Sequence, residues 1–159
     1  MNHEHAHCDA GQTLKKAGLA RTSQRLAVLS ALIDATGPLS VRDLFTAVRH
    51  RITIDRVTIY RILTSLRSGG IVREIDTGSG TACYEVACQH NPLHPHFRCR
   101  RCGCLTCLPA LTLSQAWEWY SRPYGFTIEN INIHMTGVCS TCQQHDDRNR
   151  VASKGRPPQ

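Results

Sequence analysis

Two Cys-x-x-Cys pairs constrain the fold of this chain more than any other feature. They are Cys99 with Cys102 and Cys139 with Cys142, separated by 36 residues in a chain with nine cysteines. Each tight turn presents two thiolates to one ion, and two such turns complete a tetrahedral structural zinc site. A thioredoxin-like redox pair belongs to a different fold, and an iron–sulfur cluster built on the cysteine run after Cys99 would leave the second pair without a role. The sequence therefore predicts a structural zinc.

A second group of potential ligands lies just before the first pair. His94 and His96 flank a proline, which favours extended backbone, so both imidazoles face the same side. Cys88 comes six residues before His94, and Glu74 lies on a predicted strand. We expect these four residues to form a second metal site, and its mixed ligands fit zinc best. The alternative is a pair of surface histidines beside a small buried thiol.

The first half of the chain has the element order of a winged helix-turn-helix. Apolar residues at helical spacing, N-capping residues and Gly stops predict helices, and a turn-rich segment separates two strand-like runs. The first expected helix is Thr13–Leu19, and the second is capped by Thr22 or Ser23 and ends at Gly37. The third is capped by Ser40, and the fourth runs from Asp55 to Gly69. The expected strands are Ile71–Ile75 and Cys83–Val86. This fold binds DNA, and it also occurs as a protein-interaction module.

Charge and composition narrow the class of function. Residues 15–73 carry eleven Lys and Arg against three Asp, a net charge of +8, and the whole chain carries +7. A basic half beside a Cys- and His-rich half indicates a polyanion-binding module joined to a metal module. The sequence has no run long enough to cross a bilayer, no secretory signal and no nucleophile or phosphate-loop motif. We therefore expect a cytoplasmic protein that is not an enzyme, with no membrane partner and no small-molecule substrate.

Four motifs in order resemble the ferric uptake regulator family. They are Leu14–Arg25, Val57–Leu63, His94–Gly103 and Gly137–Cys142. The resemblance covers residues 13–143 and implies a homodimeric, metal-responsive transcription factor. Its N-terminal winged helix would bind double-stranded operator DNA, and its C-terminal α/β domain would dimerise. The expected fold class is thus α+β, a winged helix-turn-helix followed by a small α/β dimerisation domain with a structural zinc.

The same resemblance points to DNA contacts on the fourth predicted helix. It implies that Tyr60 and Arg61 touch the operator, with Thr58 beside them, and Thr58 and Arg61 lie on the polar face of that helix. Arginine reads guanine bidentately, and other basic residues mostly grip phosphate. The alternative for Tyr60 is partial packing against the next helix. The candidate DNA-binding residues are Arg56, Thr58, Tyr60, Arg61, Lys15, Arg21 and Arg25.

The branch of the family follows from the ligand pattern. A Cys six residues before a His-x-His pair is similar to the zinc uptake regulator branch. Cys107 stands eight residues after Cys99, where many members have a Glu ligand, so Cys107 is an alternative to Glu74. We expect a zinc-responsive repressor of metal uptake genes with two zinc ions per chain, one structural and one regulatory. The alternatives are an iron or peroxide sensor of the same family, and an interaction module with only structural zinc.

The expected domain organisation follows from these assignments. Within the second half, a helix is predicted over Leu111–Arg122 and a strand over Phe126–Met135. The expected segments are a flexible tail (1–11), the DNA-binding domain (12–87), a hinge (88–95), the dimerisation domain (96–144) and a disordered tail (145–159).

Overall fold

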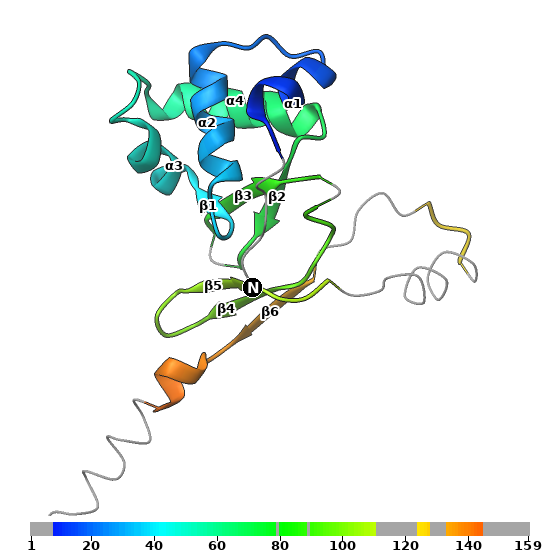
Figure 1. Cartoon of the computed structure of the whole chain (residues 1–159). Coiled ribbons are helices and arrows are strands. Elements are labelled where there is room, and N and C mark those ends of the chain that lie inside the picture. Colours follow the sequence, from blue (N-terminus) through cyan, green and yellow to red (C-terminus); the bar gives the residue numbers. More distant parts are fainter. Residues whose placement is uncertain (1–7, 79, 89, 111–123, 128–132, 145–159) are drawn as a thin grey trace, which may run out of the picture.

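In the part of the chain that the structure describes, the fold combines four helices, a short helical segment at residues 140–144 and two small sheets. The computed structural model describes residues 8–78, 80–88, 90–110, 124–127 and 133–144 (Figure 1). The helices are α1 (Ala10–Lys16), α2 (Ser23–Ile33), α3 (Val41–Val48) and α4 (Arg56–Ser68); the strands are β1 (Leu39–Ser40), β2 (Val72–Asp76), β3 (Ala82–Val86), β4 (His96–Cys99), β5 (Leu105–Cys107) and β6 (His134–Gly137). The expected α+β class is confirmed.

Three helices begin where their capping residues predict. The Thr22 hydroxyl caps α2, and Ser40 and Asp43 form a reciprocal capping box at α3. The Asp55 carboxylate accepts a 2.6 Å hydrogen bond from the Thr58 N–H at the start of α4. Each cap satisfies backbone donors that the first helical turn leaves without partners.

Helix α1 begins earlier than the sequence predicts. It starts at Ala10 rather than Thr13, because the Asp9 side chain accepts a 2.6 Å hydrogen bond from the Gln12 N–H and caps the helix. Helix α1 and its cap therefore begin within residues 1–11, the segment expected to be a flexible tail.

The hydrophobic core lies between the helices and the first sheet. Four apolar residues at helical spacing on one face of α4 are buried there: Ile59, Ile62, Leu63 and Leu66. Burying each such side chain contributes about 1.5–3 kcal/mol. The core fixes this face of α4 inward, which leaves the opposite face exposed.

The first sheet has the strand order β1-β3-β2, and its register decides which side chains share a face. Strands β2 and β3 pair antiparallel, with Arg73 opposite Glu85 and Glu74 opposite Tyr84. Because side chains alternate along a strand, Arg73 and Glu85 share one face and Glu74 points to the other. In Figure 1 the four helices gather on one side of this sheet, and the second sheet lies beyond its other end.

The second sheet has the order β5-β4-β6, with β5 antiparallel and β6 parallel to β4. Strand β6 spans His134–Gly137, so it shares only His134 and Met135 with the strand expected over Phe126–Met135. Residues 128–132 of that strand and the helix expected over 111–122 lie outside the described residues. Among the described helices, none is long and apolar enough to cross a membrane.

Candidate metal centres and nucleic-acid interface

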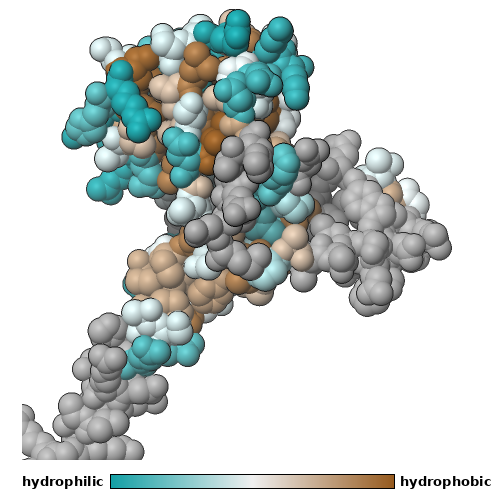
Figure 2. Space-filling view, in the orientation of Figure 1, coloured by the Kyte–Doolittle hydropathy of each residue, from teal (hydrophilic) through white to brown (hydrophobic). Residues whose placement is uncertain are grey.

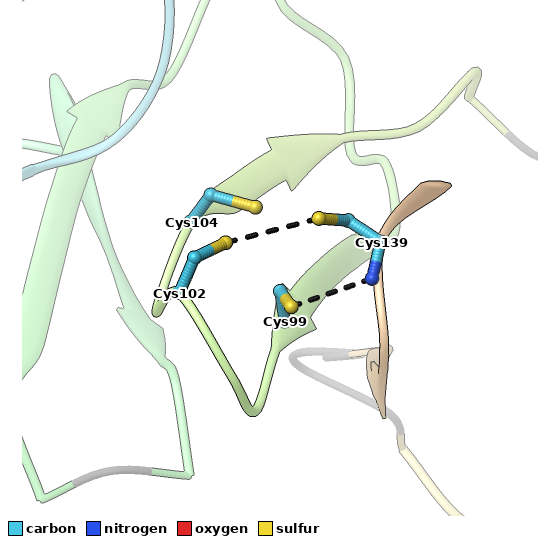
Figure 3. Close-up of side chains that lie close together, drawn as sticks. All are labelled: Cys99, Cys102, Cys104 and Cys139. Atoms are coloured by element: carbon cyan, nitrogen blue, oxygen red, sulfur yellow. Dashed lines mark hydrogen bonds between the residues drawn. The ribbon is translucent and has the colours of Figure 1, made fainter. Parts of the chain in front are cut away.

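A cluster of thiols joins the turn after β4 to the segment after β6. The sulfurs of Cys99, Cys102, Cys104 and Cys139 lie within 4.8 Å of one another (Figure 3). Cys102 Sγ is 3.8 Å from Cys139 Sγ, and the Cys139 N–H donates to Cys99 Sγ at 3.3 Å. Zinc–thiolate bonds of about 2.3 Å in a tetrahedron place sulfurs roughly 3.8 Å apart. The spacing of these thiols therefore suits a structural metal.

Cys142 lies beside the same cluster. Its pKa is raised to about 12, first by the Cys139 side chain and then also by Cys102 and Cys99. The backbone N–H groups of Cys102 and Cys139 lower the pKa of the Cys99 thiol to about 5. Cys104 was not assigned a role from the sequence; the turn at Gly103, whose φ is 73°, brings it beside Cys102. Four thiols thus form the cluster, and Cys142 is a fifth thiol close to it.

A second cluster lies between the two sheets. The ligand atoms of Glu85, His94, His96 and Cys107 fall within 4.8 Å of one another. Glu85 Oε2 is 3.3 Å from His96 Nε2 and 3.4 Å from His94 Nε2. Nitrogen and oxygen ligands about 2.0–2.1 Å from a tetrahedral zinc are separated by roughly 3.4 Å. We call this group the hinge cluster.

The strands explain why these four side chains meet. Glu85 belongs to β3 of the first sheet, whereas His96 and Cys107 are register partners on β4 and β5 of the second. His94 precedes His96 by two residues, so the two rings lie on the same side, with centroids 4.6 Å apart. The hinge cluster therefore links the winged-helix sheet directly to the second sheet.

Arg73 and the backbone hold the hinge cluster in place. The Arg73 Nε donates to Glu85 Oε1 at 2.6 Å, which leaves Oε2 facing the two histidines. The same guanidinium donates to the carbonyls of Asn91 and Pro92, and the Pro92 carbonyl also contacts His94 Nδ1 at 2.8 Å. A contact of this kind fixes the ring so that Nε2 faces the ligands. The cluster thus has a supporting shell that orients its ligand atoms.

Electrostatics within the hinge cluster follow from burial and proximity. Burial raises the pKa of Glu85, but the His94 and His96 contacts and the Arg73 charge outweigh it, so the net pKa is lowered. Cys107 and then Glu85 raise the pKa of His94 to about 10. Burial lowers the pKa of His96, but contacts with Cys107 and Glu85 outweigh it and leave a raised pKa. His96 Nδ1 is buried and has no hydrogen-bond partner among the described residues.

The sequence led us to expect Glu74 and Cys88 beside the two histidines. The structure places both residues elsewhere. Glu74 lies on the opposite face of the hairpin, where it pairs with Arg67 at the surface. Cys88 lies instead with Cys8 and His90, in a separate group of ligand atoms within 4.8 Å of one another. Cys107, the expected alternative ligand, does lie in the hinge cluster, and Glu85 takes the place expected for Glu74.

The exposed face of α4 carries the candidate DNA contacts. Tyr60 is 55% exposed, so more than half of its surface is open to solvent. Arg56 and Arg61 are exposed and Thr58 is half-buried. The Arg56 guanidinium lies over the Phe45 ring of α3, 5.4 Å from its centroid, which fixes its direction by a cation–π contact.

The other candidate contacts lie on α1 and around the start of α2. Lys15 and Arg21 are exposed. Arg25 is half-buried, and its guanidinium donates to the Ala20 carbonyl at 3.1 Å. These cations are available to phosphate, with Arg25 partly engaged within the protein.

A winged helix with an exposed basic helix face, joined to a sheet that carries groups of thiol and imidazole ligands, defines the class of metal-responsive transcriptional regulators. The sequence matches the ferric uptake regulator family over residues 16–136, and the chain belongs to this family.

Individual relatives and solved structures agree with this assignment. The ferric uptake regulation protein of Neisseria meningitidis serogroup A is 30% identical over 137 residues, which cover 85% of this chain and 94% of the relative. The crystal structure of the Vibrio cholerae ferric uptake regulator matches 82% of this chain and 100% of that chain, with 27% identity and a TM-score of 0.67. A zinc uptake regulator in complex with zinc and DNA covers 92% of this chain and 99% of that chain. Its TM-score is 0.65 at 22% identity, a likeness that concerns the fold alone.

Proposed function

We propose that this chain is a zinc-responsive transcriptional repressor of metal uptake genes, which binds operator DNA as a dimer in the cytoplasm. The observation that carries the proposal is the hinge cluster, in which Glu85 of the DNA-binding sheet meets His94, His96 and Cys107 of the second half. A ligand held by all four residues would fix the two halves relative to each other.

The donor set favours zinc as the sensed metal. The hinge cluster offers one thiol, two imidazoles and one carboxylate, and a thiolate favours zinc or copper(I) over iron(II) and manganese. Its atoms are already spaced as tetrahedral zinc ligands would be, as the 3.3 and 3.4 Å separations between Glu85 and the histidines indicate. Regulation by iron or by peroxide is the alternative within the family.

A second zinc would serve structure. We assign it to Cys99, Cys102 and Cys139, with the fourth thiolate from Cys104 or from Cys142. These residues connect the β4–β5 turn with the start of the helical segment at residues 140–144. A tetrathiolate ion there would hold the second sheet together, as structural zinc does in small domains that lack a large core.

The surface supports DNA binding and dimerisation at opposite ends of the chain. Tyr60 and Arg61 on α4 face solvent, where α4 can enter a major groove. In the second half, Tyr124 and Phe126 are each 62% exposed and stack on each other, and Met135 on β6 is 40% exposed. Exposed apolar side chains of this size fit a surface that a second copy covers. Figure 2 shows hydrophilic and apolar residues intermixed over the helices and a mainly apolar surface over the β4–β5 hairpin.

The proposed switch needs only a modest free energy. A hundredfold gain in DNA affinity corresponds to about 2.7 kcal/mol of coupling. Holding Glu85 against the histidines orders the hinge and sets the angle of α4 relative to the second sheet. Because coupling is reciprocal, operator DNA should tighten zinc at the hinge cluster and leave the thiol cluster nearly unchanged.

The first test is metal content per chain by elemental mass spectrometry, before and after mild chelation. The hinge cluster and the thiol cluster are expected to contribute two zinc ions, of which mild chelation removes the one at the hinge cluster. One fixed zinc with labile iron would favour the iron or peroxide branch, and one fixed zinc with no exchangeable metal would contradict the switch.

The second test is DNA affinity, measured by fluorescence anisotropy on duplexes selected from a random pool with and without zinc. Cys107→Ser should abolish the zinc dependence, because it removes a hinge ligand. Cys83→Ser is the matched control, since Cys83 is another half-buried thiol and lies outside every ligand group found in the described residues. Equal zinc dependence in both variants would refute the assignment of the hinge cluster.

A further inference from the structure

A third group of soft ligands lies outside both proposed metal sites. Cys8 Sγ is 3.5 Å from Cys88 Sγ and 3.9 Å from His90 Nδ1. All three ligand atoms fall within 4.8 Å of one another. They come from opposite ends of the DNA-binding half, 80 residues apart in sequence for the two cysteines.

Regular structure brings these residues together. Cys8 directly precedes Asp9, the residue that caps α1, so the capped helix fixes where its thiol emerges. Cys88 pairs with Asn91 in an isolated bridge after β3. The Asn91 side chain is buried and donates to the Val86 carbonyl at 2.7 Å, which anchors this short segment. Both sides of the group are therefore tied to ordered backbone.

We propose that Cys8, Cys88 and His90 form a third metal site, which binds zinc. Two thiolates and an imidazole are the ligands that zinc prefers, and tetrahedral zinc places a sulfur and a nitrogen ligand roughly 3.6 Å apart. The site opens into a hollow of about 340 Å³ that is also lined by Gln12, Thr13 and Lys16. Three protein ligands facing open space leave a fourth position for water, the arrangement of an accessible rather than a closed zinc site.

Zinc at this site would tie the start of α1 to the segment that leads into the hinge cluster. Helix α1 carries Lys15 and Lys16 in its last turn, and Lys15 is one of the proposed phosphate contacts. The site goes beyond the proposed zinc switch, because none of its residues belongs to the hinge cluster or the thiol cluster. It would fasten α1 in place without taking part in sensing.

The test is a cobalt(II) titration of the reduced full-length protein under anaerobic conditions. Cobalt replaces zinc in such sites and gives a thiolate charge-transfer band, so the number of thiolate-bound ions is counted directly. Cys8→Ser should bind one cobalt fewer per chain than the wild type, while Cys83→Ser binds the same number as the wild type. His90→Gln, which keeps both thiols, should weaken the same binding step.

A second readout locates the effect. Zinc should slow amide hydrogen exchange over α1 in the wild type, and Cys8→Ser should remove this protection while Cys107→Ser retains it. The Cys107→Ser variant separates this site from the hinge cluster, so failure of one proposal is distinguishable from failure of the other. An unchanged cobalt count in Cys8→Ser would overturn the third site. A wild type isolated two hydrogens lighter than its all-thiol mass, with Cys8 and Cys88 joined as a disulfide, would also overturn it.

Discussion

Two carboxylates on the same hairpin differ in environment, and exchanging each for its amide tests the site directly. Glu85 on β3 is buried, whereas Glu74 on β2 pairs with Arg67 at the surface. Glu85→Gln and Glu74→Gln each remove one negative charge and change the side-chain shape very little. We expect the first to destabilise the protein strongly and the second to have almost no effect.

The expected magnitudes follow from burial. The Glu85 side chain is 6% exposed and faces Arg73 at 2.6 Å, with His96 and His94 at 3.3 and 3.4 Å. Removing one partner of a buried ion pair costs about 3–5 kcal/mol, and the amide keeps some of the hydrogen bonding, so we expect about 3 kcal/mol. Glu74 and Arg67 are 37% and 53% exposed, and such surface pairs contribute about 0–1 kcal/mol.

Urea unfolding followed by circular dichroism at the helix band measures both variants after mild chelation has removed labile metal. With a slope of about 2 kcal/mol/M, Glu85→Gln should lower the unfolding midpoint by about 1.5 M and Glu74→Gln by less than about 0.5 M. Before chelation, the Glu85 variant should also hold one metal ion fewer per chain than the wild type. A midpoint shift for Glu74→Gln as large as that for Glu85→Gln would refute the placement of the site.

Three further predictions concern other parts of the molecule. The Thr58 backbone N–H lowers the pKa of Asp55 below its ordinary value of 3.8. The ionised cap of α4 therefore stabilises the protein above pH 3.8, and this stabilisation is lost as the pH falls through the lowered pKa. Asp55→Asn should therefore flatten the acid dependence of the urea midpoint; an unchanged acid dependence would contradict this. Cys104→Ser and Cys142→Ser should each retain the tightly held zinc in elemental analysis, because either thiol can complete the site, and the double variant should lose it. Release by one single variant would assign the fourth ligand to that residue alone. Arg61→Ala should weaken operator binding by about 1–3 kcal/mol in anisotropy titrations while stability stays within about 0.5 kcal/mol, since the side chain is exposed; unaltered affinity would remove Arg61 from the interface.

The helical half of the fold was predictable because its signals are local. Capping residues and the spacing of apolar residues decide where a helix begins and which face is buried, and both lie within a few residues of each other. Thr22, Ser40 and Asp55 cap as expected. The predicted start of α1 was wrong by three residues, because the capping role of Asp9 was not recognised in the sequence.

The hinge cluster could be predicted only in part. His94 and His96 follow from their spacing of two residues, but the choice between Glu74 and Glu85 depends on strand register. Because side chains alternate along a strand, the pairing across the hairpin decides that Glu74 and Glu85 lie on opposite faces. Glu85 had a usable signal, since it is a charged residue between buried Tyr84 and Val86.

The position of Glu85 would connect the proposed hinge switch to the helices that are expected to bind DNA. Strand β3 is the central strand of its sheet, so it pairs with β1, where Ser40 caps α3, and with β2. Only residues 69–71 separate β2 from α4. Both helices of the DNA-binding motif are thus attached to the strand that carries Glu85.

The 2.7 kcal/mol that a hundredfold switch requires is about the worth of one or two hydrogen bonds to charged groups. Arg73 already makes such bonds to Glu85 and to the hinge carbonyls. The switch therefore needs no rearrangement of the core, only a change in whether the hinge cluster is held closed.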